Sequence, residues 1–320
     1  MTQAVALAQQ ASTGVSQGFR NRIINGAMVI DQRNAGASIT PTNGQFSVDR
    51  WESTLTQASK YSVQQNAGSV TPPTGFANYL GSTSLSAYSV VSGDLFGLRQ
   101  AIEGFNVADL GWGSASAKTV TISAWVRSSL TGTFGGSILN SAQNRSYPFT
   151  YTISSANTWT QISVTIVGDT SGTWLTTNGV GMYVFFGLGA GSTYSGTAGA
   201  WAGATYYSAT GATSVVGTNG ATFYITGVQL EVGSTATSFD YRPYGTELAL
   251  CQRYYQLISA YLASATAYPY SCGTTKRAAP TITSNAANFT LAGITPSTDT
   301  FWARDTAAAA QYNIFISIEL

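Results

Sequence analysis

Apolar and polar residues alternate with a period of two along several stretches of the chain. The clearest stretch is residues 119–129, TVTISAWVRSS. Its apolar set is Val120, Ile122, Ala124 and Val126, and its second set is Thr121, Ser123, Trp125 and Arg127. Successive side chains of a strand point to opposite faces, so this stretch predicts a strand with one face in a core. In residues 223–230 the same rule predicts one face made of Phe223, Ile225, Gly227 and Gln229.

Turn and helix signals divide the remaining chain. The Asn25-Gly26 pair lies between two apolar runs and predicts a turn. We interpret residues 22–51 as the opening strands of a β-sandwich, with Asp49 and Arg50 as a structural ion pair. One helix is expected over residues 246–257, with an apolar side made of Leu248, Cys251, Tyr255 and Leu257. The final YNIFISIEL predicts an apolar strand, buried either in its own fold or between subunits.

Composition favours an all-β fold. The apolar fraction is 44%, enough for a large core, but only 8% of the residues are charged, where about a quarter is usual. Surface polarity must therefore come from Ser, Thr, Asn, Gln and Gly. Together with 18 Tyr and 14 Phe, this mix suits short strands and turns. The 320 residues allow one large β domain or two smaller ones.

Charge and missing residue types exclude several classes of function. The net charge is +1, and no apolar run approaches the ~20 residues of a membrane helix, so we expect neither nucleic-acid binding nor membrane insertion. The chain has no His, which excludes nucleophilic catalysis by a Ser–His or Cys–His pair. Cys251 and Cys272 are expected to be free thiols, as in a protein made in a reducing cytoplasm, although they could pair. We see no secretory signal pattern and expect none.

The acidic residues do not form a recognisable catalytic pair. Glycoside hydrolysis needs two carboxylates across one cleft, and the 13 acids of this chain are scattered. Glu103 and Glu231 lie in predicted strands near turns and come nearest to such a pair. A rim acid with an ordinary partner is the commoner case for each, so we expect no enzymatic activity.

Four groups of residues stand out as motifs. They are NRIINGAMVIDQRNAG with VDRW, LRQAIEG with TVTISAWVRSS, ATFYITGVQLEVGSTATSFDYRPYGTELALCQRYYQ, and KRAAPTITSNAANFTLAGI. Together they resemble the jelly-roll virion proteins of tailed bacteriophages, known as tail fibre or receptor-binding proteins. The resemblance runs in patches over residues 22–281 and is most specific at 22–51 and 223–256. It implies an attachment peptide at 1–18, a jelly-roll β-sandwich of the carbohydrate-binding-module type at 19–243, and a helix plus a small β-rich C-terminal domain at 244–320.

The resemblance also implies partners. In such proteins an N-terminal peptide attaches the fibre to a tail or baseplate protein, and here Val5, Leu7 and Ala8 would form its apolar stripe. This stripe is too weak to fold alone, and a disordered terminus is the alternative. By analogy with fibres we expect a homotrimer in the virion tail, assembled in the host cytoplasm. The low charge and the apolar final strand suit a subunit interface.

A structural cation is a further hypothesis. Jelly rolls of the carbohydrate-binding type often hold Ca²⁺ through carboxylate and carbonyl oxygens, and no other cofactor is expected. Asp31, Asp49 and Asp240 are the candidates, because they lie near the two chain ends of the predicted sandwich. Relatives often carry an acid or glycine where this chain has Ala27, and this departure argues against a metal.

Aromatic residues carry the remaining site hypothesis. Sugars present apolar C–H faces, which dock on aromatic rings while polar groups take the hydroxyls. The loop-like stretch 192–220 offers Trp201, Tyr194, Tyr206 and Tyr207, and the C-terminal domain offers Trp302 and Tyr270 as a second platform. The other tryptophans lie among strand or turn residues and are interpreted as core.

These observations predict a phage virion protein that recognises host surface polysaccharide during adsorption. The resemblance carries the phage assignment, and composition and periodicity carry the β class. A head decoration fibre or a tail adaptor, using the jelly roll for protein contacts, is the alternative. A depolymerase is a third and more distant reading.

Overall fold

The computed structural model describes residues 19–262, 268–286, 289–291, 300–305 and 310–320. The predicted attachment residues Val5, Leu7 and Ala8 lie outside these residues. Among the residues described, no helix combines the length and apolar character that a membrane crossing needs. Regular structure in this part of the chain is almost entirely β-strand, so the fold is all-β, as the sequence predicts.

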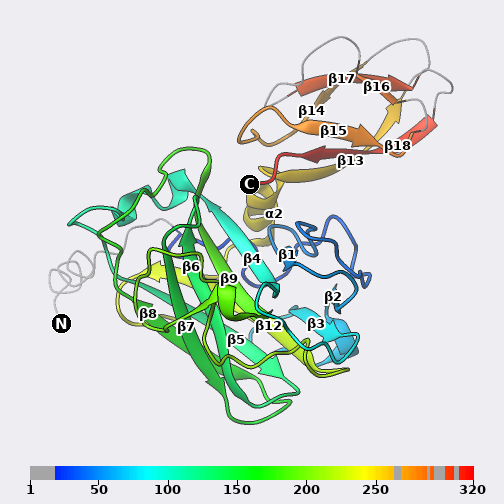
Figure 1. The fold of residues 1–320 in the computed structure, drawn as a ribbon. Helices are drawn as coiled ribbons and strands as arrows, with labels where there is room; N and C mark the ends of the chain where they lie inside the picture. The colour runs from blue at the N-terminus through cyan, green and yellow to red at the C-terminus, as the bar shows by residue number, and fades with distance from the viewer. Residues whose placement is uncertain (1–18, 263–267, 287–288, 292–299, 306–309) are drawn as a thin grey trace, which may run out of the picture.

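Two antiparallel five-stranded sheets pack face to face as a jelly-roll sandwich (Figure 1). The first, called the β4 sheet, has the order β1 (Glu52–Leu55), β4 (Leu95–Glu103), β9 (Val180–Ala190), β6 (Gly132–Asn140) and β7 (Ser146–Ile153). The second, called the β12 sheet, has the order β2 (Tyr61–Gln65), β3 (Leu80–Ser84), β12 (Thr222–Val232), β5 (Val120–Ser128) and β8 (Thr160–Ile166). The short strands β10 (Ser195–Gly196) and β11 (Ser208–Ala209) pair in parallel between β9 and β12 in the sequence. Single 3₁₀ turns are η1 (Ala67–Ser69), η2 (Gly104–Asn106), η3 (Ala108–Leu110) and η4 (Ser192–Tyr194).

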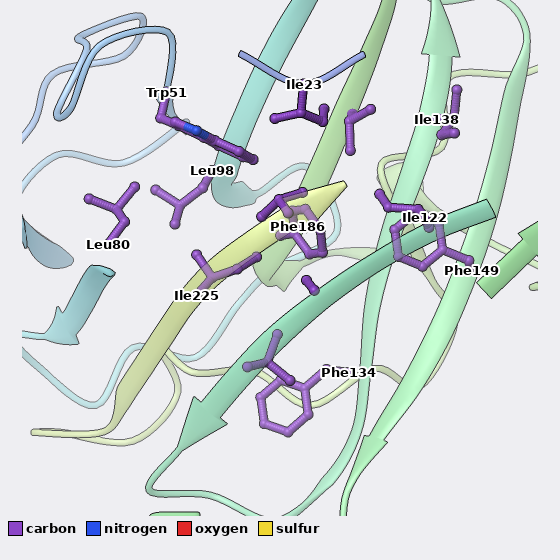
Figure 2. Close-up of a cluster of buried hydrophobic side chains, with 14 of the residues drawn as sticks. Ile23, Trp51, Leu80, Leu98, Ile122, Phe134, Ile138, Phe149, Phe186 and Ile225 are labelled. Carbon is purple, nitrogen blue, oxygen red and sulfur yellow. The ribbon is translucent and has the colours of Figure 1, made fainter. Parts of the chain in front are cut away.

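The core lies between the two sheets and is built mainly from strand side chains that point inward, joined by Ile23 and Trp51 from the segment before β1 (Figure 2). The alternation predicted for residues 119–129 is confirmed, because the apolar set of β5 is buried in this core. Phe134 of β6 stacks on Phe223 of β12, with ring centroids 5.9 Å apart, so the sheets interlock there. Full burial of one such ring contributes about 1.5–3 kcal/mol.

The predicted face of β12 is wrong beyond Ile225. The register of β12 against β5 shifts between Thr226 and Gln229, which is a β-bulge. The bulge reverses the alternation, so Val228 and Leu230 enter the core, and Gln229 turns to the other face. Gly227 at the bulge has φ +60°, a backbone conformation that favours glycine.

The segment of residues 22–51 does not form the predicted opening strands. Apart from single bridges of Ile39 to Val63 and of Phe46 to Glu52, it runs as turns and irregular chain, because several of its backbone groups bond side chains or β12. The predicted Asp49–Arg50 ion pair is also wrong: Arg50 pairs with Glu319, and Asp49 accepts hydrogen bonds from Gln32. The Asn25-Gly26 turn is present, and Met28 N donates to Asn25 O over 3.1 Å.

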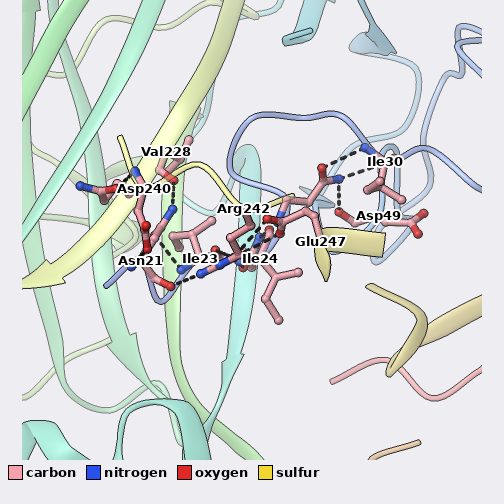
Figure 3. Close-up of polar contacts among 12 residues, drawn as sticks. Asn21, Ile23, Ile24, Ile30, Asp49, Val228, Asp240, Arg242 and Glu247 are labelled. Atoms are coloured by element: carbon pink, nitrogen blue, oxygen red, sulfur yellow. Dashed lines mark hydrogen bonds and ion pairs between the residues drawn. The ribbon is translucent and has the colours of Figure 1, made fainter. Parts of the chain in front are cut away.

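A buried hydrogen-bond network ties this segment to the sandwich and to the chain that follows it (Figure 3). We call it the polar joint; it consists of Asn21, Asn25, Asp49, Arg242 and Glu247. The Asn25 side chain donates to the carbonyls of Ile30 (2.8 Å) and Asp49 (2.9 Å), and it accepts from Ile30 N (3.0 Å). Asn21 bridges to β12 through Val228 O and Leu230 N. Gly26 fits beside β12 because a Cβ there would lie 2.2 Å from Val228 O.

The chain after the sandwich begins with helix α2 (Tyr244–Gln252), which is shorter than predicted, since Tyr255 and Leu257 belong to a strand. One three-stranded sheet has the order β13 (Tyr255–Leu262), β18 (Ala310–Ser317) and β15 (Thr281–Ser284). The other has the order β14 (Tyr268–Ser271), β17 (Thr300–Asp305) and β16 (Phe289–Leu291). The predicted final strand is thus central in its own sheet. Cys251 and Cys272 are both thiols, as predicted, and both are buried.

Arg253 fastens this region to β4. Its guanidinium makes two hydrogen bonds to Glu103, at 3.0 and 2.7 Å, and Tyr254 donates its hydroxyl to the same carboxylate over 2.6 Å. Burial acts to raise the pKa of Glu103, but the hydrogen bonds from Arg253 and Tyr254 outweigh it and leave that pKa below its usual value. Glu103 is therefore a charged structural anchor.

Candidate functional site

A groove of about 750 Å³ lies on the outer face of the β4 sheet. Along β4, Leu98 and Ile102 enter the core, whereas Arg99 and Ala101 point to the outer face. The groove is lined by Asn43, Thr54, Leu55, Thr56, Leu95, Arg99, Gln143, Thr193, Tyr194, Ala204, Thr205, Tyr206 and Tyr207. Arg99 is the single charged residue in this lining.

The floor of the groove holds Arg99 in a fixed orientation. Its Nε and Nη2 donate to the two carboxylate oxygens of Glu52 over 3.0 and 2.7 Å. The guanidinium also lies 4.8 Å from the ring centroid of Tyr183. Burial acts to lower the pKa of Arg99, but the hydrogen bond and charge of Glu52 outweigh it and raise that pKa. The third nitrogen, Nη1, has no acceptor among the described residues and is not enclosed, so it can donate to a ligand.

Three of the predicted tyrosines form the wall of this groove. Tyr207 is buried and packs edge-on against Phe185 and Tyr194, at 5.1 and 5.7 Å between ring centroids. Its hydroxyl bonds the side-chain oxygen of Gln143, and its backbone N donates to Tyr194 O over 2.8 Å. Tyr194 and Tyr206 are half-buried and leave ring surface open to the groove. Parallel pairing of β10 with β11 holds the two parts of this wall together.

Trp201 lies elsewhere, although it comes from the same loop. It packs edge-on against Trp112 and Trp174, with centroids 5.3 and 5.5 Å away, and against Tyr147 at 5.1 Å. Its indole N–H donates to Val167 O over 2.7 Å. With its ring contacts and its donor committed to the protein, Trp201 serves packing and does not line the groove.

The second predicted platform is not brought together. Tyr270 packs against the core of the C-terminal sheets, and its ring stacks on Phe301 at 5.5 Å. Trp302 follows Phe301 on β17, points to the opposite face, and is 38% exposed. These two rings therefore do not share one surface.

The three predicted metal ligands do not gather either. Within the described residues, no group of three Asp, Glu, Cys or His is placed to hold a metal ion. Asp31 accepts from the backbone of Asn34 and Gly36, and Asp240 accepts from the backbone of Arg20 and Asn21. Asp49 lies on the other side of the polar joint from Asp240 (Figure 3). Burial raises the pKa of Asp49 to about 6, although Gln32 acts to lower it.

The two acids considered for catalysis are both buried and partnered. Glu103 bonds Arg253 and Tyr254, as described above. Glu231 accepts from the backbone N and the hydroxyl of Thr237, at 2.8 and 2.7 Å. Neither lines the groove.

Sequence reasoning missed Arg99 and Gln143. Arg99 is a charged residue within the mostly apolar stretch LFGLRQAIEG, at a position that the strand alternation assigns to the outer face. This position could have marked it as a candidate binding residue. Its partner Glu52 is 47 residues away, so no local spacing could have revealed the pair.

Comparisons with known proteins give structural neighbours but no family. No protein family matches the chain, and no curated protein matches it. Among solved structures, the enzymatically active domain of tailspike protein 4 of bacteriophage CBA120 is 13% identical, with a TM-score of 0.36 over 67% of this chain and 22% of that one. The family 11 carbohydrate-binding module of Clostridium thermocellum is 13% identical, with a TM-score of 0.32 over 62% and 96%. TmCBM61, in complex with β-1,4-galactotriose, is 9% identical, with a TM-score of 0.30 over 59% and 92%.

This chain thus spans about a fifth of the tailspike domain. Similarities this weak identify neither a family nor a ligand.

Proposed function

We propose that this protein binds glycan in the groove of the β4 sheet and serves as a phage tail fibre or receptor-binding protein. One observation carries the binding proposal: Arg99 is fixed by Glu52 with one nitrogen left open, beside the half-exposed rings of Tyr194 and Tyr206. Rings take the apolar face of a sugar, and a preorganised donor takes a hydroxyl without a large loss of entropy.

The groove favours a neutral glycan. The charge of Arg99 is offset by Glu52 directly beside it, and the other lining residues are uncharged. The groove is open to solvent along the sheet, and its volume lies within the range of ordinary ligand sites. We therefore expect binding of an uncharged stretch of host surface polysaccharide, without its hydrolysis.

The virion role rests on the resemblance of residues 22–51 and 223–256 to phage proteins. In the structure these two segments contact each other through the polar joint, for example where Arg242 donates to Ile23 O over 2.9 Å. The motifs are therefore parts of one packed unit, which supports treating them as one signature. Trimer formation and tail attachment through residues 1–18 belong to the same proposal.

Adsorption competition tests the proposal. Purified protein is incubated with host cells, and phage attachment is counted with and without soluble host polysaccharide. We expect the protein to block attachment and the polysaccharide to reverse the block. The double variant Tyr194→Ala/Tyr206→Ala should lose the block, whereas Tyr244→Ala, which removes an exposed ring outside the groove, should keep it.

Other outcomes select the alternatives. A protein that neither binds cells nor blocks attachment has no receptor role, and tight binding to a baseplate or capsid protein would then indicate an adaptor or a decoration fibre. Shortening of the polysaccharide during the assay would indicate a depolymerase.

A further inference from the structure

A second recess lies on the outer face of the β12 sheet, on the opposite side of the sandwich from the groove. Its volume is about 190 Å³. We call it the bulge pocket; it is lined by Thr74, Phe76, Ser123, Ala124, Trp125, Gln161, Gly227, Thr237, Phe239 and Tyr241. None of these residues is charged.

The pocket exists because of the β-bulge in β12. On β5, Trp125 pairs with Thr226 and Ser123 pairs with Gln229, so β12 has one extra residue between these pairs, and the sheet is locally distorted there. A Cβ at Gly227 would lie 2.6 Å from the Phe76 ring and 3.2 Å from the Trp125 ring. Glycine is therefore required there, and its missing side chain lets both rings approach the floor.

The polar groups of the pocket that have no partner among the described residues include Ser123 Oγ, Trp125 Nε1 and the Gln161 amide. Gln161 lies directly across from Trp125 on β8, and Ser123 is two residues along β5 on the same face. The five tryptophans whose indole N–H has a backbone acceptor are Trp51, Trp112, Trp159, Trp174 and Trp201. Trp125 is thus the indole of the sandwich with an uncommitted donor.

An aromatic rim completes the pocket. Phe76, Phe239 and Tyr241 contact one another with centroids 4.8–5.4 Å apart, and the Tyr241 hydroxyl is fixed by a 2.6 Å bond to Gly75 O. Ring surface next to neutral, uncommitted donors and acceptors matches a ligand with apolar C–H faces and hydroxyls. The volume lies below that of sites for drug-sized ligands, so the pocket suits one ring and no longer chain.

We propose that the bulge pocket binds a single neutral sugar ring. Trp125 Nε1 and the Gln161 amide would bond the ring hydroxyls, and the aromatic rim would cover its apolar face. The inference shares its ligand class with the proposed function of the groove, but it rests on separate residues. With both sites occupied, one sandwich would hold a polysaccharide segment in the groove and one terminal sugar ring in the bulge pocket, which raises avidity for a dense surface.

The test is ¹⁹F NMR of protein labelled with 5-fluorotryptophan. The chain has seven Trp, and Trp125→Phe assigns the Trp125 signal by its loss. The probes are methyl β-glucoside, methyl β-galactoside and N-acetylglucosamine. We expect one of them to shift the Trp125 signal saturably and leave the Trp159 signal in place, since Trp159 is on the same face but bonded to Thr71.

Two variants test whether the shift of the Trp125 signal comes from sugar bound in the bulge pocket. Gln161→Ala removes one hydrogen bond and should weaken binding about 5-fold. Tyr206→Ala, in the groove, should leave the Trp125 titration unchanged even if it abolishes polysaccharide binding. If no probe shifts the Trp125 signal, or if Gln161→Ala titrates like the native chain, the bulge pocket is not a sugar site and the proposal is wrong.

Discussion

The polar joint and the groove are both rich in polar side chains, but they use them in opposite ways. In the joint, Asn21 and Asn25 are buried, and their amides are committed to backbone groups of the same chain. In the groove, Arg99 is equally well fixed but keeps one nitrogen for a partner outside the protein. The joint is built from the two most specific motifs of the chain, whereas the groove takes Arg99 alone from a motif, LRQAIEG. A conspicuous motif can therefore mark where a fold is fastened, while most of the candidate binding residues lie outside the motifs.

The largest effect is expected from Asn25→Ala in the joint. The variant leaves the buried Asp49 carbonyl and the Ile30 N–H without partners and removes one of the two hydrogen bonds to the Ile30 carbonyl, at about 1 kcal/mol or more each, so the free energy of unfolding should fall by about 3–4 kcal/mol. Chemical denaturation measures it. Asn157→Ala is the control, since Asn157 has the same φ of +57° on an exposed loop, and it should cost less than about 1 kcal/mol. Equal losses in the two variants would show that backbone strain, and not the network, is responsible.

The pH dependence of Asp49 should come next in size. Its pKa rises from 3.8 to about 6 on folding, chiefly through burial, so the folded chain holds this proton more tightly than the unfolded chain. The contribution to stability is full below pH 3.8 and is lost as the pH rises through about 6, by about 3 kcal/mol in total. The free energy of unfolding of the native chain and of Asp49→Asn, measured by chemical denaturation at several pH values between 4 and 7, isolates this contribution. A stability difference between the two that stays constant over this range would contradict the prediction.

A smaller effect is expected in the groove itself. Tyr206→Ala should weaken glycan binding about 10-fold, or about 1.4 kcal/mol, because a stacking ring is lost. Because Tyr206 is only half-buried, the free energy of unfolding should change by less than about 1 kcal/mol. Calorimetric titration with host polysaccharide, paired with denaturation, separates the two quantities. Trp201→Ala should show the reverse pattern, with stability lost and affinity kept; loss of affinity there would move the site to the tryptophan cluster.

The smallest effect is expected from Glu52→Gln. The amide keeps the shape of the side chain but gives Arg99 one acceptor in place of two, so its guanidinium is held less firmly. We expect about 3-fold weaker binding of a neutral glycan, from the same titration. An acidic glycan should gain affinity in this variant, because the positive charge of Arg99 is no longer offset. No change with either glycan would remove Arg99 from the site.

Features that depend on neighbouring residues could be predicted from the sequence, whereas features that depend on contacts between distant residues could not. The strand at 119–129 was found because one face of it enters the core, and the loop that carries Tyr194, Tyr206 and Tyr207 was found from its composition. The reversal at Gly227 was missed because a bulge is defined by pairing with β5. Trp201 lies apart from the tyrosines of its loop, which the sequence could not reveal because its contacts are with the distant Trp112 and Trp174.

The place of β12 in its sheet has a consequence for the order of events during synthesis. It pairs with both β3 and β5, although it follows them by more than a hundred and about a hundred residues respectively. Until residue 232 has been made, β3 and β5 have no strand between them, and the core has one incomplete wall. Pairing of strands that lie this far apart in the sequence is slow and takes on the order of milliseconds to seconds. The nascent chain therefore exposes unpaired strand edges for most of its translation. Contact with other nascent chains translated from the same mRNA would then favour aggregation over folding.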